Sequence, residues 1–203
     1  MSEGADPRSR LSLAQAMVLF VGGGLLISLG DRAHIECGVL VQNNTAFFGQ
    51  AWWVVPMFGS VSLALFGSYR ALRMRFDEPA TGRNPKRAVL NAVLFLTVYC
   101  STGPLAEFGF SLAMLLSGLW VVRLALHREN RATIFLCLLL AVLGPIGEGV
   151  VASLGMFHYT NPDFGSVHSW LPAVYLHGGL VVHTVEGFLF PGSDAASPGN
   201  QRP

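Results

Sequence analysis

The sequence contains few charged residues. Only 12% of its 203 residues are Asp, Glu, Lys or Arg, about half of the roughly 25% that is typical of soluble domains, whereas 52% are apolar. So few charges cannot cover a water-exposed surface, which argues against an ordinary soluble domain. The formal net charge of +1 gives no reason to expect nucleic acid as a partner.

Cysteines and catalytic motifs are scarce as well. Cys37, Cys100 and Cys137 lie far apart without CxxC or histidine spacing, so we interpret them as packed thiols and expect no metal site. The sequence has no HExxH, GxSxG or Walker motif. Every aspartate, Asp31 included, is expected in a loop or a tail. These absences predict neither catalytic residues nor a cofactor.

The sequence does have long uncharged runs, such as 37–69, 132–147 and 164–185. A hydrocarbon core about 30 Å thick needs about 20 helical residues to cross it. We therefore predict an all-α polytopic membrane protein, a bundle of six transmembrane helices that forms one domain over 1–203, with polar tails at about 1–11 and 191–203. The predicted helices cover 12–31, 50–70, 87–103, 104–126, 132–156 and 167–190.

Basic residues are distributed unevenly among the expected connections. The two tails and the second and fourth loops together hold twelve Lys and Arg residues, whereas the other three loops hold only Arg32. Because basic loops remain in the cytoplasm, both termini are predicted to be cytoplasmic, which requires an even number of spans. The expected location is a bacterial cell (inner) membrane, or the endoplasmic reticulum membrane if the host is eukaryotic.

Glycine and proline are frequent inside the predicted helices. Small residues let helices approach closely in lipid, so Gly22, Gly118 and the other helix glycines are interpreted as packing positions. Pro56, Pro145 and Pro172 should kink their helices, because proline removes a backbone donor. A kinked bundle tends to open between its helices, which favours a lipid-sized cavity.

Ionisable groups inside apolar helices cost roughly 2.5 to 3.5 kcal/mol at a helix centre and therefore need an explanation. The candidates are Glu107, Glu148, His177, His183 and Glu186. Glu148 is either a structural polar group or a ligand or proton site, and its carboxyl group should have a hydrogen-bond partner in both cases. His183 and Glu186 share a helix face near the cytoplasmic end, where they can pair. His177 is interpreted as a hydrogen-bonded helix contact.

Three segments resemble the insulin-induced gene (Insig) family. The stretch from Gly155, GMFHYTNPDFGSVHSWLPAVYLHGGL, resembles the family's last loop and helix, AWWVVPMFG at 51–59 resembles part of its second helix, and SGLW at 117–120 resembles part of its fourth. The matches keep their order and spacing across most of the chain. The matching positions, for which we expect a structural or interface role, are Trp52, Trp53, Pro56, Tyr159, Pro162, Asp163, Phe164, Trp170 and Pro172.

The resemblance implies a lipid-sensing or lipid-binding membrane protein, because known members bind oxysterols and regulate sterol synthesis through the escort protein Scap. Glu107 stands where the family has a sterol-linked glutamine. An acidic residue that the family needs for partner binding is replaced by Leu124, which argues against a Scap-type partner. The residues expected to contact a lipid are Glu107, Phe108, Ser111, Trp120 and Glu148.

We therefore expect a non-enzymatic membrane protein that holds a neutral lipid, an oxysterol or a diacylglycerol-like glycerolipid, in a cavity between its helices. In this hypothesis Glu107 orients the hydroxyl end of the lipid, and a homo-oligomer is compatible with it. Two alternatives stay open. One is a proton-coupled carrier that uses Glu148, Glu107 and His177, and the other is a lipid-modifying enzyme that uses His183 and Glu186.

Overall fold

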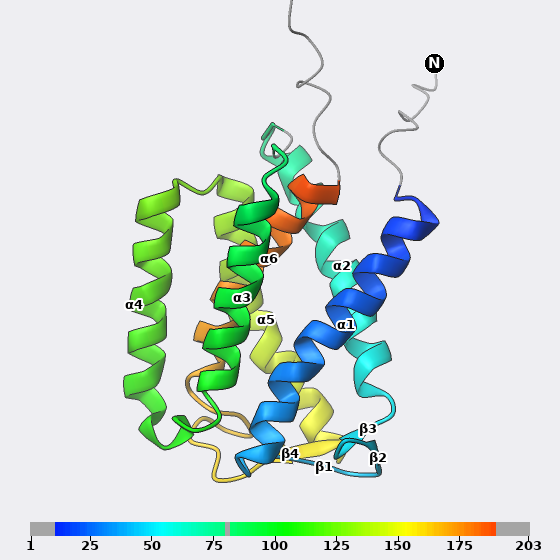
Figure 1. Cartoon of the computed structure of the whole chain (residues 1–203). Coiled ribbons are helices and arrows are strands. Elements are labelled where there is room, and N and C mark those ends of the chain that lie inside the picture. Colours follow the sequence, from blue (N-terminus) through cyan, green and yellow to red (C-terminus); the bar gives the residue numbers. More distant parts are fainter. Residues whose placement is uncertain (1–10, 80–81, 190–203) are drawn as a thin grey trace, which may run out of the picture.

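The computed structural model describes residues 11–79 and 82–189, which form a bundle of six α-helices closed at one end by short strands (Figure 1). The expected polar tails lie outside the described residues, apart from residue 11. A 3₁₀ turn, η2 (Ala106–Phe108), precedes the fourth helix. The helices are α1 (Leu13–Glu36), α2 (Val54–Arg75), α3 (Pro85–Ser101), α4 (Gly109–His127), α5 (Arg131–Ser153) and α6 (Leu171–Leu189).

Side-chain caps determine where three of these helices begin. Ser12 and Gln15 form a reciprocal capping box at the start of α1, with bonds of 2.9 and 3.2 Å. Asn84 accepts from the backbone N–H of the third residue of α3 at 3.0 Å, and Asn130 accepts from the corresponding N–H of α5 at 2.8 Å. Each cap satisfies a backbone donor that has no partner inside the helix, so these starts are set locally.

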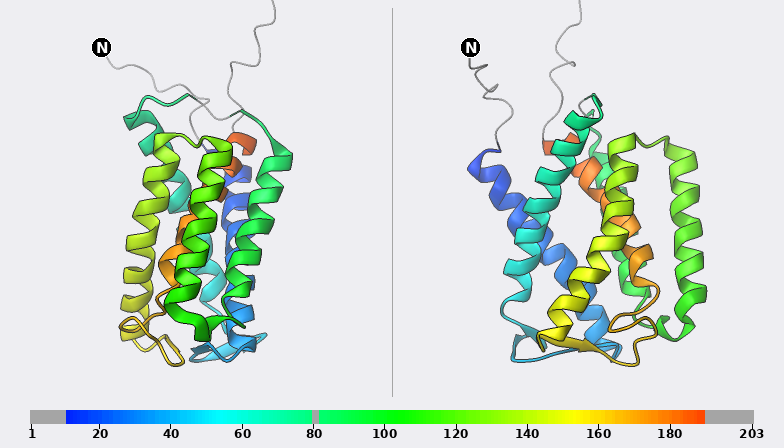
Figure 2. Two further views of the ribbon diagram at one scale, coloured as in Figure 1. Left: turned by 90° about the vertical axis from the view of Figure 1, so that its left-hand side faces the viewer. Right: turned by 180° about the vertical axis from the view of Figure 1, so that it is seen from behind.

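The two ends of the bundle differ. α1 begins and α6 ends at the same end, here called the terminal end, where the α2–α3 and α4–α5 connections also lie (Figures 1 and 2). At the opposite strand end, β1 (Leu40–Gln42) pairs with β4 (Phe157–Tyr159) and β2 (Thr45–Phe47) pairs with β3 (Gln50–Ala51), both antiparallel. The β1–β4 pair joins the α1–α2 connection to the α5–α6 connection.

Three helical segments are long and apolar enough to cross a membrane by length and composition, among the residues that the structure describes. They are Leu13–Glu36, Ala106–His127 and Arg131–Ser153. α6 runs from the strand end to the terminal end but carries His177, His183 and Glu186, which are buried among the other helices. The helical membrane bundle agrees with the prediction, whereas the six-span count and the cytoplasmic termini stay predictions.

Small residues let α5 and α6 pack closely. A Cβ atom at Gly144 would lie 2.5 Å from the Tyr175 ring, and one at Gly179 would lie 2.5 Å from the Cys137 sulfur. A Cβ atom added at Gly22 or Gly118 would have no other group within 4 Å. The packing interpretation is therefore confirmed at Gly144 and Gly179, whereas Gly22 and Gly118 are not close to another helix of this chain.

The prolines differ in their position along the helices. Pro145 lies inside α5. Pro56 and Pro172 lie in the first turns of α2 and α6, where a backbone N–H has no partner within the helix. The reason for expecting a kink therefore does not apply to these two positions.

Candidate functional site

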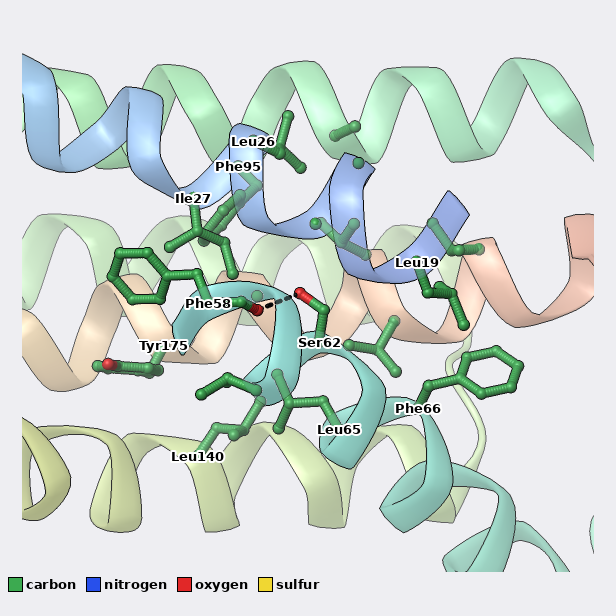
Figure 3. Close-up of a pocket in the computed structure, with 18 of the residues that line it drawn as sticks. Leu19, Leu26, Ile27, Phe58, Ser62, Leu65, Phe66, Phe95, Leu140 and Tyr175 are labelled. Atoms are coloured by element: carbon green, nitrogen blue, oxygen red, sulfur yellow. Dashed lines mark hydrogen bonds between the residues drawn. The ribbon is translucent and has the colours of Figure 1, made fainter. Parts of the chain in front are cut away.

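A cavity of about 340 Å³ lies between α1, α2, α3, α5 and α6. Its walls are almost entirely aliphatic and aromatic (Figure 3). Leu19 and Phe66 lie toward one end in this view, and Tyr175 lies toward the other. The Ser62 hydroxyl also lines the cavity, but it donates to the Phe58 carbonyl oxygen at 2.8 Å within α2. The middle of the cavity therefore presents mainly carbon atoms.

Three residues with polar groups, Glu148, Tyr175 and Tyr99, line the strand end of the cavity. Glu148 is near the strand end of α5, and its carboxyl group accepts the Tyr175 hydroxyl of α6 at 2.7 Å. The other carboxyl oxygen accepts the hydroxyl of Tyr159, which belongs to β4. The predicted hydrogen-bond partner of Glu148 is thereby confirmed, since Tyr175 comes from a neighbouring helix.

A second carboxyl group, that of Asp31, is connected to this polar end through Tyr99. The Tyr99 hydroxyl donates to Asp31 at 2.6 Å, and the Gln42 amide donates to the other Asp31 oxygen at 3.2 Å. Asp31 was expected in a loop, but α1 continues to Glu36, and Asp31 is 8% exposed inside the helix. This correction has a physical reason: hydrogen bonds from α3 and β1 satisfy the carboxyl group, so the helix can contain it.

The polar end can accept a further hydrogen bond. A carboxylate has about four lone-pair directions, and the two tyrosine hydroxyls use about two of them at Glu148. Burial, with the neighbouring Glu148 carboxyl group second, raises the pKa of Tyr159 well above its ordinary value of 10, so this residue keeps its donating hydroxyl. A hydroxyl group entering the cavity would find acceptors at its strand end and apolar walls elsewhere.

Of the five residues expected to contact a lipid, the structure places Glu148 at this cavity. Glu107 and Phe108 are exposed on η2, and Ser111 is exposed on α4. Trp120 is buried, but it packs in a cluster with Cys137, Leu176 and Leu180. α4 contributes no residue to the cavity wall, which is why the positions on and beside it lie elsewhere.

The segments that carry the family resemblance lie mainly around the strand end. Trp170 is fully buried, and its ring is stacked between the rings of His34 and His168. The distances between ring centroids are 5.2 Å to His34 and 5.1 Å to His168. Asp163 accepts from the backbone N–H and the hydroxyl of Ser169 at 2.7 and 2.6 Å, which orders the turn before α6. The exposed positions are Trp52, Pro56, Pro162, Asp163 and Phe164, whereas Trp53 and Pro172 are half-buried.

A buried polar network at the terminal end was missed by the sequence analysis. Arg123 of α4 is 5% exposed and donates to Asn91 of α3 at 2.7 Å and to His177 Nδ1 of α6 at 2.5 Å. His177 Nε2 lies 3.0 Å from the Leu116 carbonyl oxygen and must donate to it. His177 is therefore a neutral helix contact, as predicted, and an added proton on Nδ1 would break the Arg123 bond. The signal that could have indicated this site is an arginine inside a helix after a long uncharged run.

His183 and Glu186 connect α6 to α2 instead of serving as the expected pair. His183 Nδ1 lies 2.6 Å from the Tyr69 hydroxyl, and Glu186 lies 3.3 Å from an Arg73 nitrogen. Glu186 is fully buried, and His183 is 6% exposed. Among the described residues, no three His, Cys, Asp or Glu side chains are grouped closely enough to hold a metal ion.

The groups required by the carrier alternative do not lie together. Glu148 lies at the strand end of the cavity, Glu107 is exposed on η2, and His177 is held between Arg123 and the Leu116 carbonyl group. The arrangement of these three residues therefore does not favour a proton path.

Comparison with known proteins shows relatives over most of the chain, although no family model matches it. The chain is 24% identical to the insulin-induced gene 1 protein of Xenopus laevis over 205 residues, covering 97% of this chain and 80% of the relative. It is also 24% identical to the human protein of that name over 182 residues, covering 85% of this chain and 64% of the relative.

Solved structures show the same fold. A mycobacterial Insig homolog, MvINS from Mycobacterium vanbaalenii, superposes with a TM-score of 0.76 at 21% identity, covering 94% of this chain and all of that chain. A cross-linked trimer of MvINS gives a TM-score of 0.77 with the same coverage.

Proposed function

Because this chain belongs to the insulin-induced gene family, we propose that it binds a neutral, hydroxyl-bearing lipid in its central cavity as a lipid-sensing membrane protein. The relationship itself supports a membrane regulatory protein related to sterol sensing. The finer proposal depends on one observation: an otherwise apolar cavity ends in the Glu148 carboxyl group and the Tyr175 hydroxyl.

The chemistry of the walls defines the lipid class. Small-molecule sites typically have volumes of about 300 to 1,000 Å³, apolar walls and a few polar groups that fix orientation, and this cavity matches that description. An anionic head group such as a phosphate would face the Glu148 carboxyl group without a basic partner lining the cavity. A neutral lipid with a free hydroxyl, an oxysterol or a diacylglycerol-like glycerolipid, fits both requirements.

The proposed pose follows from the two ends of the cavity. The lipid hydroxyl donates to Glu148 at the strand end, and the hydrocarbon part extends along α1 and α2 toward Leu19 and Phe66. Apolar contacts supply most of the affinity, at roughly 25 cal/mol for each Å² removed from water. The hydrogen bond to Glu148 selects which end of the lipid lies innermost. The activity is binding rather than catalysis.

The proposal extends to location and assembly. With the strand end on the outer side, the twelve basic residues of the terminal end and tails would lie in the cytoplasm of a bacterial cell. Since the related mycobacterial protein has been solved as a cross-linked trimer, a homotrimer is the assembly to test first. Replacement of the family's acid by Leu124 leaves a Scap-type partner outside the proposal.

A pair of matched ligands tests the proposed function. Purified protein in nanodiscs is titrated with a radiolabelled diglyceride and then with the same diglyceride acetylated at its free hydroxyl. We expect saturable binding of the first lipid and about tenfold weaker binding of the second, which corresponds to a hydrogen bond of about 1.4 kcal/mol. The same comparison is made with 25-hydroxycholesterol and its diacetate. Failure of both free lipids to bind saturably would overturn the proposal.

A further inference from the structure

Exposed residues of α1 and α6 line the cavity near the place where α1 and α3 separate. The two helices are in contact near the strand end, where His34 lies 2.8 Å from the Thr102 hydroxyl and Tyr99 packs against Gly30. From there they diverge toward the terminal end, and the last turns of α6 end in the space between them (Figure 1). The contacts between α1 and α3 near the strand end are therefore not continued at the terminal end, where the two helices lie apart (Figure 1).

Part of the cavity wall is exposed. Val18 of α1 is 60% exposed and Phe188 of α6 is 38% exposed, although both line the cavity, and Gly22 is an exposed lining residue as well. Gln15 donates to the Leu189 carbonyl oxygen at 2.9 Å. Residues 15, 18 and 22 share one helix face, so this bond turns the same face of α1 toward the end of α6. Three of the exposed lining residues, Val18, Gly22 and Phe188, therefore lie on α1 and α6 toward the terminal end, and the fourth, Val61, belongs to α2.

Phe188 is in contact with a basic residue. The guanidinium carbon of Arg83, from the α2–α3 connection, lies 5.1 Å from the centre of the Phe188 ring. An arginine over an aromatic face is attracted electrostatically, and the contact is weak enough to break and re-form. The ring can therefore move aside and return to this position.

We propose that the lipid enters and leaves the cavity sideways, from the membrane leaflet at the terminal end, through an opening between α1 and α6, and that Phe188 is the gate. The inference depends on the proposed lipid binding. The alternative route, through the strand end, is closed by the Glu148, Tyr159 and Tyr175 hydrogen bonds and by the β1–β4 pair. A lipid that moves sideways keeps its hydrocarbon chains out of water throughout, whereas a route through either aqueous face does not.

Measured rates and the equilibrium affinity distinguish a residue at the opening from a residue that contacts the bound lipid. A side chain that only narrows the opening raises the barrier between the bound and the free lipid. It therefore slows association and dissociation by the same factor and leaves the dissociation constant unchanged. A side chain that removes a contact of the bound lipid changes the dissociation constant instead.

The experiment compares three variants with the wild type. Gly22→Phe narrows the opening, and it can be accommodated because no other group lies within 4 Å of a Cβ atom at Gly22. Gly67→Phe is the matched control, since Gly67 also has open space around its Cβ position but does not line the cavity. Phe188→Ala opens the gate. Each protein is placed in nanodiscs, and binding and release of a nitrobenzoxadiazole-labelled diglyceride are followed by stopped-flow fluorescence.

We expect Gly22→Phe to slow association about tenfold, Phe188→Ala to accelerate it several-fold, and Gly67→Phe to match the wild type. Wild-type rates in both Gly22→Phe and Phe188→Ala would overturn the gate, and so would a Gly22→Phe protein that loses affinity at an unchanged association rate. Phe188→Ala keeps the test decisive if Gly22→Phe does not fold. Absence of saturable binding to the wild type would overturn the proposed function and the gate with it.

Discussion

Replacing Glu148 with leucine should cost stability as well as affinity, because the carboxyl group holds two tyrosine hydroxyls in place. Leucine is similar in size but accepts no hydrogen bond, so the hydroxyls of Tyr159 and Tyr175 lose this acceptor. An unsatisfied buried polar group costs about 1 to 3 kcal/mol, which gives about 2 to 6 kcal/mol for the two. Leucine gains apolar contacts in return, so we expect a net loss of about 2 to 4 kcal/mol.

The matched variant is Glu148→Gln. Its amide oxygen still accepts one tyrosine hydroxyl, and the other hydroxyl can rotate to accept from the amide nitrogen. We expect this variant to lose less than about 1 kcal/mol of stability. Its affinity for a hydroxyl-bearing diglyceride should stay within about threefold of the wild type, whereas Glu148→Leu should bind about tenfold more weakly.

The assay is chemical unfolding in detergent, followed by tryptophan fluorescence, together with competition binding of a labelled diglyceride in nanodiscs. Trp170 is buried in the same cluster as Tyr159 and reports on the strand end. If Glu148→Leu unfolds at the same denaturant concentration as the wild type, the two tyrosine bonds do not carry the stability assigned to them. If it also binds the lipid equally well, Glu148 is not the head-group acceptor.

Three further predictions concern other parts of the molecule. Arg123→Ala should lower the free energy of unfolding by about 2 to 4 kcal/mol, because His177 and Asn91 lose a charged donor, and an unfolding curve that overlays the wild type would contradict this. Burial raises the pKa of Asp163, but the hydrogen bonds from Ser169 outweigh this effect and bring the pKa below its ordinary value of 3.8. The stability that the ionised Asp163 side chain contributes should therefore be complete above pH 3.8 and be lost as the pH falls through the lowered pKa. Thermal melts at stepped pH should show that Asp163→Asn abolishes this part of the acid sensitivity. Reporter fusions after residue 78 and at the C-terminus should read cytoplasmic and one after residue 163 external, and a cytoplasmic signal from residue 163 would contradict the six-span arrangement.

The helices could be predicted because long uncharged runs and their polar boundaries are local properties of the sequence. The exact ends depended on tertiary contacts that a single sequence does not reveal. α1 continues past Asp31 because Tyr99 and Gln42 satisfy that carboxyl group. α2 begins at Val54 rather than at residue 50 because Gln50 and Ala51 pair with β2. Strands of two or three residues carry too little periodicity to be recognised.

The candidate site was only partly predictable for a similar reason. A carboxyl group in an apolar helix is conspicuous, so Glu148 could be identified as a polar group that needs partners. Its partners Tyr159 and Tyr175 come from another connection and another helix, and no spacing rule links them. Glu107 was expected to orient the lipid, but η2 places it outside the cavity, and α4 starts only at Gly109, whose φ is +44°.

The most direct test of lipid binding is to identify the lipids that the purified protein retains, using the wild type and Gly178→Leu. Gly178 lines the cavity, and a Cβ atom there would meet only the Phe95 ring at 3.6 Å, which is ordinary contact. Leucine at this position should therefore occupy lipid space without disturbing the backbone. Mass spectrometry should find a hydroxyl-bearing neutral lipid on the wild type and a large loss of it on Gly178→Leu at similar thermal stability. Wild-type protein without such a lipid, or a Gly178→Leu protein that retains it equally, would contradict the account.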